Sequence, residues 1–94
     1  MSAGRIEIET SPPGSIVPAF EVLDATHKKV LDGAHAGAAY WVGKNRAAAL
    51  FGVTPGGPFG MDMYDYMGWI QDGGGEDLYN EFYQKVLQRD VIVF

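Results

Sequence analysis

The chain has 94 residues, which is enough for one small domain at most. Its hydrophobic content of 47% is ordinary for a globular protein and argues against general disorder. The net charge of −5 argues against nucleic-acid binding, which needs clustered Lys and Arg, and the absence of cysteine excludes disulfides, thiol catalysis and zinc–thiolate sites.

The N-terminal third predicts a strand, a turn and a helix. Residues 5–10 alternate polar and apolar side chains, which indicates a half-buried strand. Residues 11–15, rich in Pro and Gly, end this strand because proline cannot donate a ladder hydrogen bond. A helix is expected over residues 18–32, with lysines near its end and Gly33 as its stop. His27 lies on the apolar stripe of this helix and is interpreted as an amphipathic boundary residue rather than a ligand.

A run of small residues followed by two aromatic residues predicts the central strand, within residues 34–44. Small side chains in a strand let another backbone or a ligand approach closely. Neighbouring strand residues point to opposite faces, so one of Tyr40 and Trp41 should face the core and the other solvent. Either a tight packing joint or the wall of a cleft fits this pattern. His35 is expected to be a packed strand residue, since no triad spacing accompanies it.

Two cations, Lys44 and Arg46, flank Asn45 just after the aromatic pair, where a short Ala-rich helix is expected over residues 45–51. Two cations beside the free N–H groups of a helix start are a candidate anion site. The alternative is a solvated polar joint, because isolated surface cations are usually no more than that. A Gly/Pro-rich loop over residues 52–58 follows, without the ending that a phosphate-binding P-loop needs.

The C-terminal part predicts two helices and a buried strand. Asp62 is a good N-cap for a helix that ends near residue 72, and three glycines then break the chain. A second helix is expected over residues 76–89, and the uninterrupted apolar residues 91–94 are typical of a covered parallel strand. The order strand, helix, strand, helices, strand predicts an α/β fold with a largely parallel sheet, as one domain over residues 1–94.

Metal binding and catalysis are not expected. The acidic residues near the C-terminal helices follow no EF-hand spacing, and acids at helix starts already have a favourable dipole. No nucleophile–base pair or metal set accompanies them, so we predict no enzyme and no cofactor.

Three patterns carry a resemblance to a known family. They are A-A-Y-W-V-G-K-N-x-A-A-A-L-F from residue 38, P-F-G-M from residue 58 and G-W-I-x-x-G-G-G-x-x-L-Y-x-E-F-Y from residue 68. With these patterns the sequence resembles the periplasmic solute-binding proteins of TRAP transporters, most closely the branch for keto acids and other monocarboxylates, from about Arg5 to Phe94.

The resemblance implies part of one lobe of a longer, two-lobed receptor. It implies one cleft wall formed by Tyr40 and Trp41, with Phe59 near the mouth, and Lys44 and Asn45 complete the candidate ligand-binding set. The family's carboxylate-binding arginine lies on a later strand that this sequence does not match. A small carboxylate or keto acid is therefore expected to bind weakly at best.

Two function classes follow from this sequence. The first is a partial receptor domain of the TRAP type, and the second is a small self-associating interaction module without a transport role. In the second, a homodimer or higher oligomer would use residues 91–94 and the aromatics of residues 64–83, and domain swapping hinged at residues 73–75 is one way to form it. The sequence contains neither a signal segment nor a run apolar enough for membrane insertion, so as written it predicts a cytosolic protein, whereas the family is periplasmic.

Overall fold

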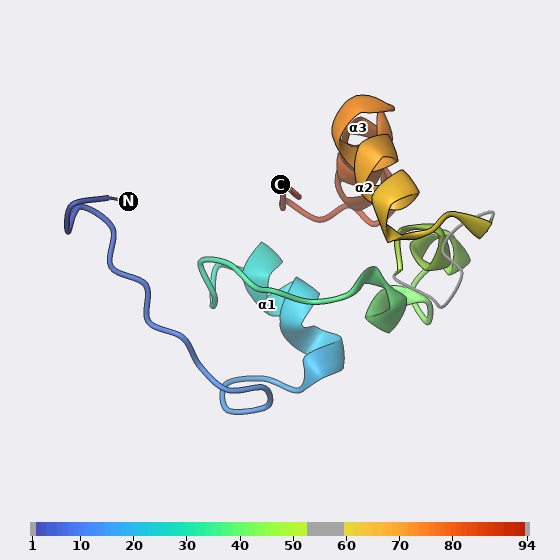
Figure 1. Cartoon of the computed structure of the whole chain (residues 1–94). Coiled ribbons are helices and arrows are strands. Elements are labelled where there is room, and N and C mark those ends of the chain that lie inside the picture. Colours follow the sequence, from blue (N-terminus) through green and yellow to red (C-terminus); the bar gives the residue numbers. More distant parts are fainter. Residues whose placement is uncertain (1, 53–59, 94) are drawn as a thin grey trace.

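The computed structural model describes residues 2–52 and 60–93, which are helical or irregular and contain no strand (Figure 1). This described part contains three α-helices together with 3₁₀ helices and one π turn. The elements are η1 Ala19–Glu21, α1 Val22–His27, η2 Ala38–Trp41, η3 Arg46–Phe51, α2 Met63–Asp72, α3 Gly75–Glu81 and the π turn η5 Phe82–Val86.

The predicted α/β fold is therefore wrong for the described residues, and the N-terminal segment shows why. Residues 5–10 form no strand and lead away from the helices (Figure 1). Ile6 and Ile8 are 67% and 79% exposed, so their alternation with polar residues covers no core. A strand needs a neighbouring strand to bond its backbone groups, and no described segment pairs with this one.

The small-residue stretch also departs from its predicted strand. Residues 34–37 are irregular and Ala38–Trp41 form the 3₁₀ turn η2. Alanine is the best helix former and a poor strand former, so a turn is the local preference when no neighbouring strand overrides it. Trp41 is 2% exposed and Tyr40 is 46% exposed, so the prediction that one of them faces the core is confirmed. They point in different directions because they are neighbours in a helical turn, and not because they alternate along a strand.

The first predicted helix is shorter than expected, because α1 ends at His27 and not at residue 32. The N–H of Lys29 donates to the carbonyl of Thr26 at 3.0 Å, and the N–H of Val30 donates to that of Ala25 at 2.9 Å. Lys29 has a φ of 59°, in the left-handed region where a glycine usually stands. This Schellman arrangement ends the helix at His27, and Gly33 is not the helix stop that the sequence predicted.

The helices predicted after residue 45 are confirmed. Asn45 caps η3 by accepting from the N–H of Ala47 at 2.9 Å, although η3 is a 3₁₀ helix. Asp62 caps α2 by accepting from the N–H of Asp65 at 2.9 Å. The helix predicted over residues 76–89 begins one residue earlier as α3 and continues as η5, but it ends at Val86 and not at residue 89.

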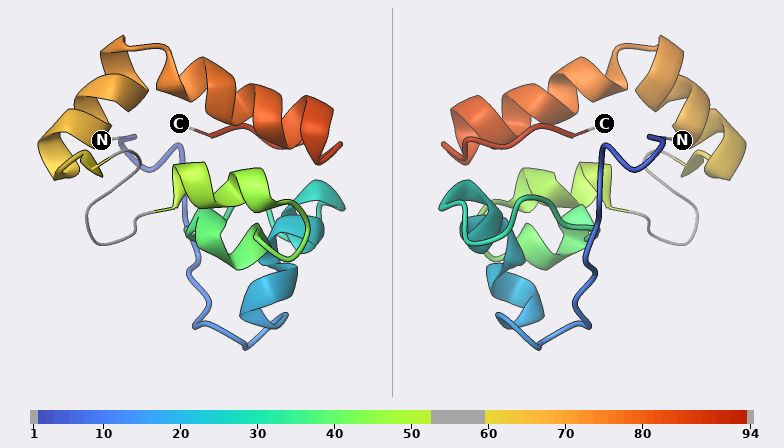
Figure 2. Two further views of the ribbon diagram at one scale, coloured as in Figure 1. Left: turned by 90° about the vertical axis from the view of Figure 1, so that its right-hand side faces the viewer. Right: turned by 90° about the vertical axis from the view of Figure 1, so that its left-hand side faces the viewer.

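The core is a cluster of aromatic and small side chains between the C-terminal helices and η2 and η3. Figure 2 shows α3 and η5 in one line across η2 and η3. The ring of Phe51 stacks on that of Tyr79 with centroids 4.4 Å apart, which joins η3 to α3. The buried members are Leu23, Ala38, Trp41, Ala48, Phe51, Tyr79, Phe82 and Tyr83.

The predicted C-terminal strand is an irregular segment held by side chains. After η5 the chain reverses, and residues 91–93 run back along the helix that precedes them (Figure 2). The amide of Asn80 donates to the carbonyl of Val93 at 3.2 Å and accepts from its N–H at 2.6 Å. Gln84 donates to the carbonyl of Val91 at 3.3 Å. Side-chain amides therefore take the place of the neighbouring strand that the apolar pattern predicted.

Candidate solute-binding site

The two aromatic residues predicted to form a cleft wall belong to different hollows. Tyr40 packs edge-on against Phe20, with ring centroids 5.4 Å apart, and lines a hollow of about 200 Å³ beside residues 11–17. Trp41 lines a larger hollow, which among the described residues shares only His35 and Ala36 with the first. Phe59 lies outside the described residues.

The two polar residues of the predicted site have partners within the chain. The ammonium of Lys44 lies 2.7 Å from a carboxylate oxygen of Asp24 and forms an ion pair with it. The side-chain oxygen of Asn45 is engaged by the N–H of Ala47 as the cap of η3. Trp41 alone among the described candidates lines the larger hollow, and solute binding by the five residues stays a prediction.

The larger hollow, which we call the Trp41 hollow, has a volume of about 410 Å³. This volume is in the range of sites for small molecules. Among the described residues no carboxylate lines it, so none of these side chains brings a negative charge to its wall. Its lining residues are Leu23, Thr26, Ala34, His35, Ala36, Trp41, Tyr79, Tyr83, Val91, Ile92 and Val93.

A chain of hydrogen bonds joins the aromatic residues of the Trp41 hollow. The indole N–H of Trp41 donates to the hydroxyl of Tyr83 at 2.8 Å, and this hydroxyl lies 3.4 Å from that of Tyr79. Tyrosine hydroxyls are protonated at neutral pH, and burial, followed by the hydrogen bond from Tyr83, raises the pKa of Tyr79 further. The hollow therefore combines apolar walls with hydroxyl groups that can donate hydrogen bonds.

Other polar side chains of the hollow differ in their availability. Thr26 donates its hydroxyl to the carbonyl of Val22 at 2.9 Å within α1, so this proton is not available to a solute. His35 was expected to be packed in a strand, but it is an exposed residue of an irregular segment that reaches the hollow. The reason is the missing sheet, which would have covered it.

The sequence prediction missed the tyrosine pair as a site feature. Tyr79 and Tyr83 are 9% and 5% exposed, and neither was among the residues predicted to bind a solute. Residues four apart lie on one helix face, so the spacing of the two tyrosines was a signal for the pair. Its partner Trp41 is 42 residues away from Tyr83 and could not be assigned from spacing.

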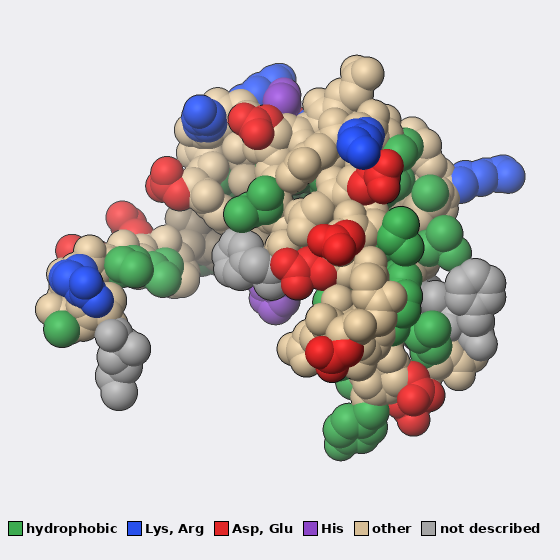
Figure 3. All heavy atoms as spheres, turned by 90° about the horizontal axis from the view of Figure 1, so that it is seen from above, with side chains coloured by type: hydrophobic (Ala, Val, Ile, Leu, Met, Phe, Trp, Pro, Cys, Tyr) green, Lys and Arg blue, Asp and Glu red, His purple; other side chains and the backbone are tan. Residues whose placement is uncertain are grey.

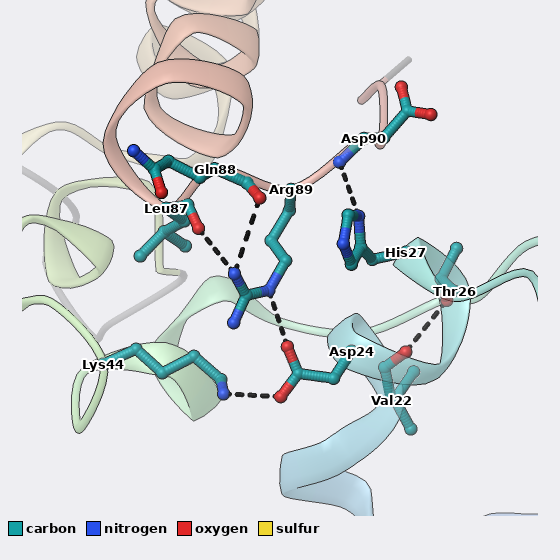
Figure 4. Close-up of polar contacts among 9 residues, drawn as sticks. All are labelled: Val22, Asp24, Thr26, His27, Lys44, Leu87, Gln88, Arg89 and Asp90. Carbon is teal, nitrogen blue, oxygen red and sulfur yellow. Dashed lines mark hydrogen bonds and ion pairs between the residues drawn. The ribbon is translucent and has the colours of Figure 1, made fainter.

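Asp24 links three parts of the chain beside this site (Figure 4). One oxygen of its carboxylate accepts from Lys44 at 2.7 Å and the other from the guanidinium of Arg89 at 2.6 Å. One turn further along α1, the Nδ1 atom of His27 accepts from the backbone N–H of Asp90 at 2.9 Å. Together these contacts hold α1 against the segment that carries Val91 into the Trp41 hollow.

Replacing Asp24→Asn should therefore lower stability in a pH-dependent way. The ammonium of Lys44 and the guanidinium of Arg89 hold the pKa of the Asp24 carboxyl below its usual value, although partial burial opposes them. A lowered pKa stabilises the fold above pH ~4, the unfolded value, and this contribution is lost as pH falls through the folded value. We expect the variant to lose about 1–2 kcal/mol at pH 7.

Urea unfolding at pH 7 and at successively lower pH measures this effect. The difference between the wild type and the Asp24→Asn variant should shrink below pH ~4. Asp32→Asn is the matched control, because Asp32 is exposed and forms no ion pair within the described residues. A difference that stays constant with pH would contradict an ionic role for Asp24.

Comparison with known proteins gives this hollow a context. The sequence matches the model of the family described as "Bacterial extracellular solute-binding protein, family 7" over residues 1–89. It is also similar to the "Monocarboxylate 2-oxoacid-binding periplasmic protein" of Nostoc sp. (strain PCC 7120), with 32% identity over 75 residues. That stretch is 80% of this chain and 20% of the relative, so the chain corresponds to about one fifth of the length of this curated protein.

These matches confirm the family resemblance seen in the sequence. They also agree with the prediction that the chain is not an enzyme, because the family consists of solute receptors. The family's description and the relative's name place such proteins outside the cytoplasm. Within the described residues, the helices are too short or too polar to cross a membrane. Because the family match covers most of the sequence, this chain belongs to the family 7 bacterial extracellular solute-binding proteins, the receptors of TRAP transporters.

Proposed function

We propose that this chain contributes one aromatic wall of a site for small carboxylates, including 2-oxoacids. The observation that carries the proposal is the Trp41 hollow, about 410 Å³ in volume, lined by aromatic and aliphatic side chains and by no described carboxylate. The relative named for binding monocarboxylate 2-oxoacids supports this class of solute. Trp41 lines the proposed site, and Tyr40, Lys44, Asn45 and Phe59 remain proposed contributors to solute binding.

Weak affinity is part of this proposal. No Arg or Lys lines the hollow among the described residues, and a carboxylate is held most strongly by a bidentate arginine. The ammonium of Lys44 is occupied by Asp24 and would have to leave that partner to reach a solute. We therefore expect a dissociation constant on the order of 1 mM, which is about −4 kcal/mol.

Titration of the 94-residue chain with pyruvate, followed by NMR, tests this function. The indole N–H resonance of Trp41 should shift and saturate at millimolar pyruvate, because Trp41 lines the hollow. The indole of Trp69 is an internal control, since Trp69 does not line it. Micromolar affinity would contradict the proposed site, and so would saturable shifts confined to Trp69 or no shifts at all.

A second candidate function is self-association through an apolar face of α2. Met63, Tyr64 and Met67 are 57%, 87% and 42% exposed, and their spacing places them on neighbouring parts of one helix surface. Hydrophobic side chains gather in a column on the face shown in Figure 3. Ile92 is 69% exposed, but Tyr79, Phe82 and Tyr83 are buried within the same chain and are not available to a second copy. This supports a smaller interface than the sequence predicted.

Sedimentation at micromolar concentration tests the second function. A specific interface buries roughly 800 Å² from each partner, and we expect a two-fold dimer. Tyr64→Ser should weaken the dimer because it removes the most exposed aromatic side chain of α2. Phe20→Ser is the matched control, since it removes a 65% exposed aromatic from η1. A folded monomer of 10.2 kDa at this concentration would contradict self-association.

A further inference from the structure

We propose that the hydroxyl pair of Tyr79 and Tyr83, oriented by Trp41, donates the hydrogen bond that holds an oxygen of the solute in the Trp41 hollow. This inference rests on the proposed binding of small carboxylates and names the group that recognises them. It concerns a neutral donor within the aromatic wall.

A count of protons shows that the pair has one donor left over. The indole N–H can only donate, so the direction of the bond from Trp41 to Tyr83 is fixed. Two phenol groups carry two protons, and the 3.4 Å contact between their oxygens uses one. Within the described residues, no acceptor takes the other. This holds whichever of the two tyrosines donates to its neighbour.

The remaining proton is in an environment where lacking an acceptor is costly. Tyr79 is 9% exposed and Tyr83 is 5% exposed. Buried hydroxyl groups are nearly always hydrogen-bonded, whereas phenylalanine would fill the same space without a donor to satisfy. Both tyrosines line the Trp41 hollow, so the acceptor for this proton can enter there.

The chemistry of the hollow favours an acceptor without protons of its own. A tyrosine hydroxyl is protonated at neutral pH, and burial raises the pKa of Tyr79 further, so this hydroxyl offers a donor and not a negative charge. The Trp41 bond polarises the Tyr83 hydroxyl, because hydrogen bonds in a chain strengthen one another. A carboxylate or 2-oxo oxygen matches this donor, and no described carboxylate competes for the hollow.

The test compares Tyr79→Phe, Tyr83→Phe and the double variant by NMR titration with pyruvate. Each single variant keeps the ring and removes one hydroxyl, and the double variant removes every donor of the pair. We expect the double variant to bind pyruvate about tenfold more weakly, as for the loss of one hydrogen bond to a charged acceptor. Tyr66→Phe is the matched control, because its hydroxyl donates to the carbonyl of Phe51 at 3.0 Å and Tyr66 does not line the hollow.

The outcomes separate this inference from the function on which it rests. If the wild type binds pyruvate and the double variant binds it equally well, the tyrosine donor is wrong and the proposed function stands. If the wild type does not bind pyruvate, both are overturned. Far-UV circular dichroism identifies variants that have lost the fold. If the double variant is among them, the folded single variants decide, since at least one should then show the weaker binding.

Discussion

Replacing Trp41→Ala should remove most of the stability of this chain. Trp41 is 2% exposed and is the largest fully buried side chain among the described residues. Truncating a buried Trp typically costs about 3–5 kcal/mol, through lost burial and the cavity left behind. That loss approaches the whole stability of many small domains. It also leaves the Tyr83 hydroxyl without its indole donor.

Urea unfolding followed by far-UV circular dichroism measures this loss. Tyr40→Ala is the matched control, because it removes the neighbouring aromatic side chain, which is 46% exposed, and should cost far less. Trp41→Phe keeps an aromatic ring and removes the N–H, so it separates packing from hydrogen bonding. Equal losses for Trp41→Ala and Tyr40→Ala would contradict the placement of Trp41 in the core.

Replacing Gly75→Ala should disrupt the joint between α2 and α3. A Cβ at this position would lie 2.9 Å from the Cα of Ile70 and from the ring of Trp69, which is closer than real Cβ atoms come. The backbone of α2 cannot move aside without shifting the whole helix. Overpacking of this kind costs about 1–3 kcal/mol, and the contact with backbone places this site at the upper end.

Gly68→Ala is the control for this joint. Gly68 lies within α2 with open space around its missing Cβ, so alanine should stabilise that helix by roughly 0.5–1 kcal/mol. Gly74→Ala should destabilise for a different reason, because Gly74 has a φ of 85° and space around it. Thermal unfolding of the three variants measures these effects. A Gly75→Ala chain as stable as Gly68→Ala would show that the glycines are only a flexible spacer.

Local signals allowed the C-terminal helices to be predicted from the sequence, because a cap acts within a few residues. Asp62 and Asn45 satisfy N–H groups two or three residues away, and the left-handed Gly74 lies between two helices. The end of α1 was missed because Lys29 adopts a conformation that a sequence normally marks with glycine. Helix boundaries without such a mark depend on what packs against them.

The sheet failed as a prediction because strand pairing is not local. Residues 5–10 alternate in polarity, and an apolar run begins at Val91. Both patterns concern side chains only, and neither shows which other segment would form the backbone hydrogen bonds of a strand. The same limit applied to the site. Asp24 and Arg89 are 65 residues apart, and the indole of Trp41 meets Tyr83 only after folding. The family resemblance depends on sequence motifs and not on contacts between distant residues, and it is confirmed.

The C-terminal part of the chain is attached by the ion pairs of Asp24 and by the aromatic cluster. Dissolved salts affect these two kinds of contact differently. Asp24, Lys44 and Arg89 keep about 27–31% of their side-chain surface in contact with water, so dissolved ions screen their attraction. The stacked rings of Phe51 and Tyr79 are buried, and sulfate strengthens such burial because it is excluded from protein surfaces. Moderate sodium chloride therefore loosens the ionic attachment first, whereas sulfate tightens the aromatic one, and the choice of salt sets which of the two contacts holds the chain together.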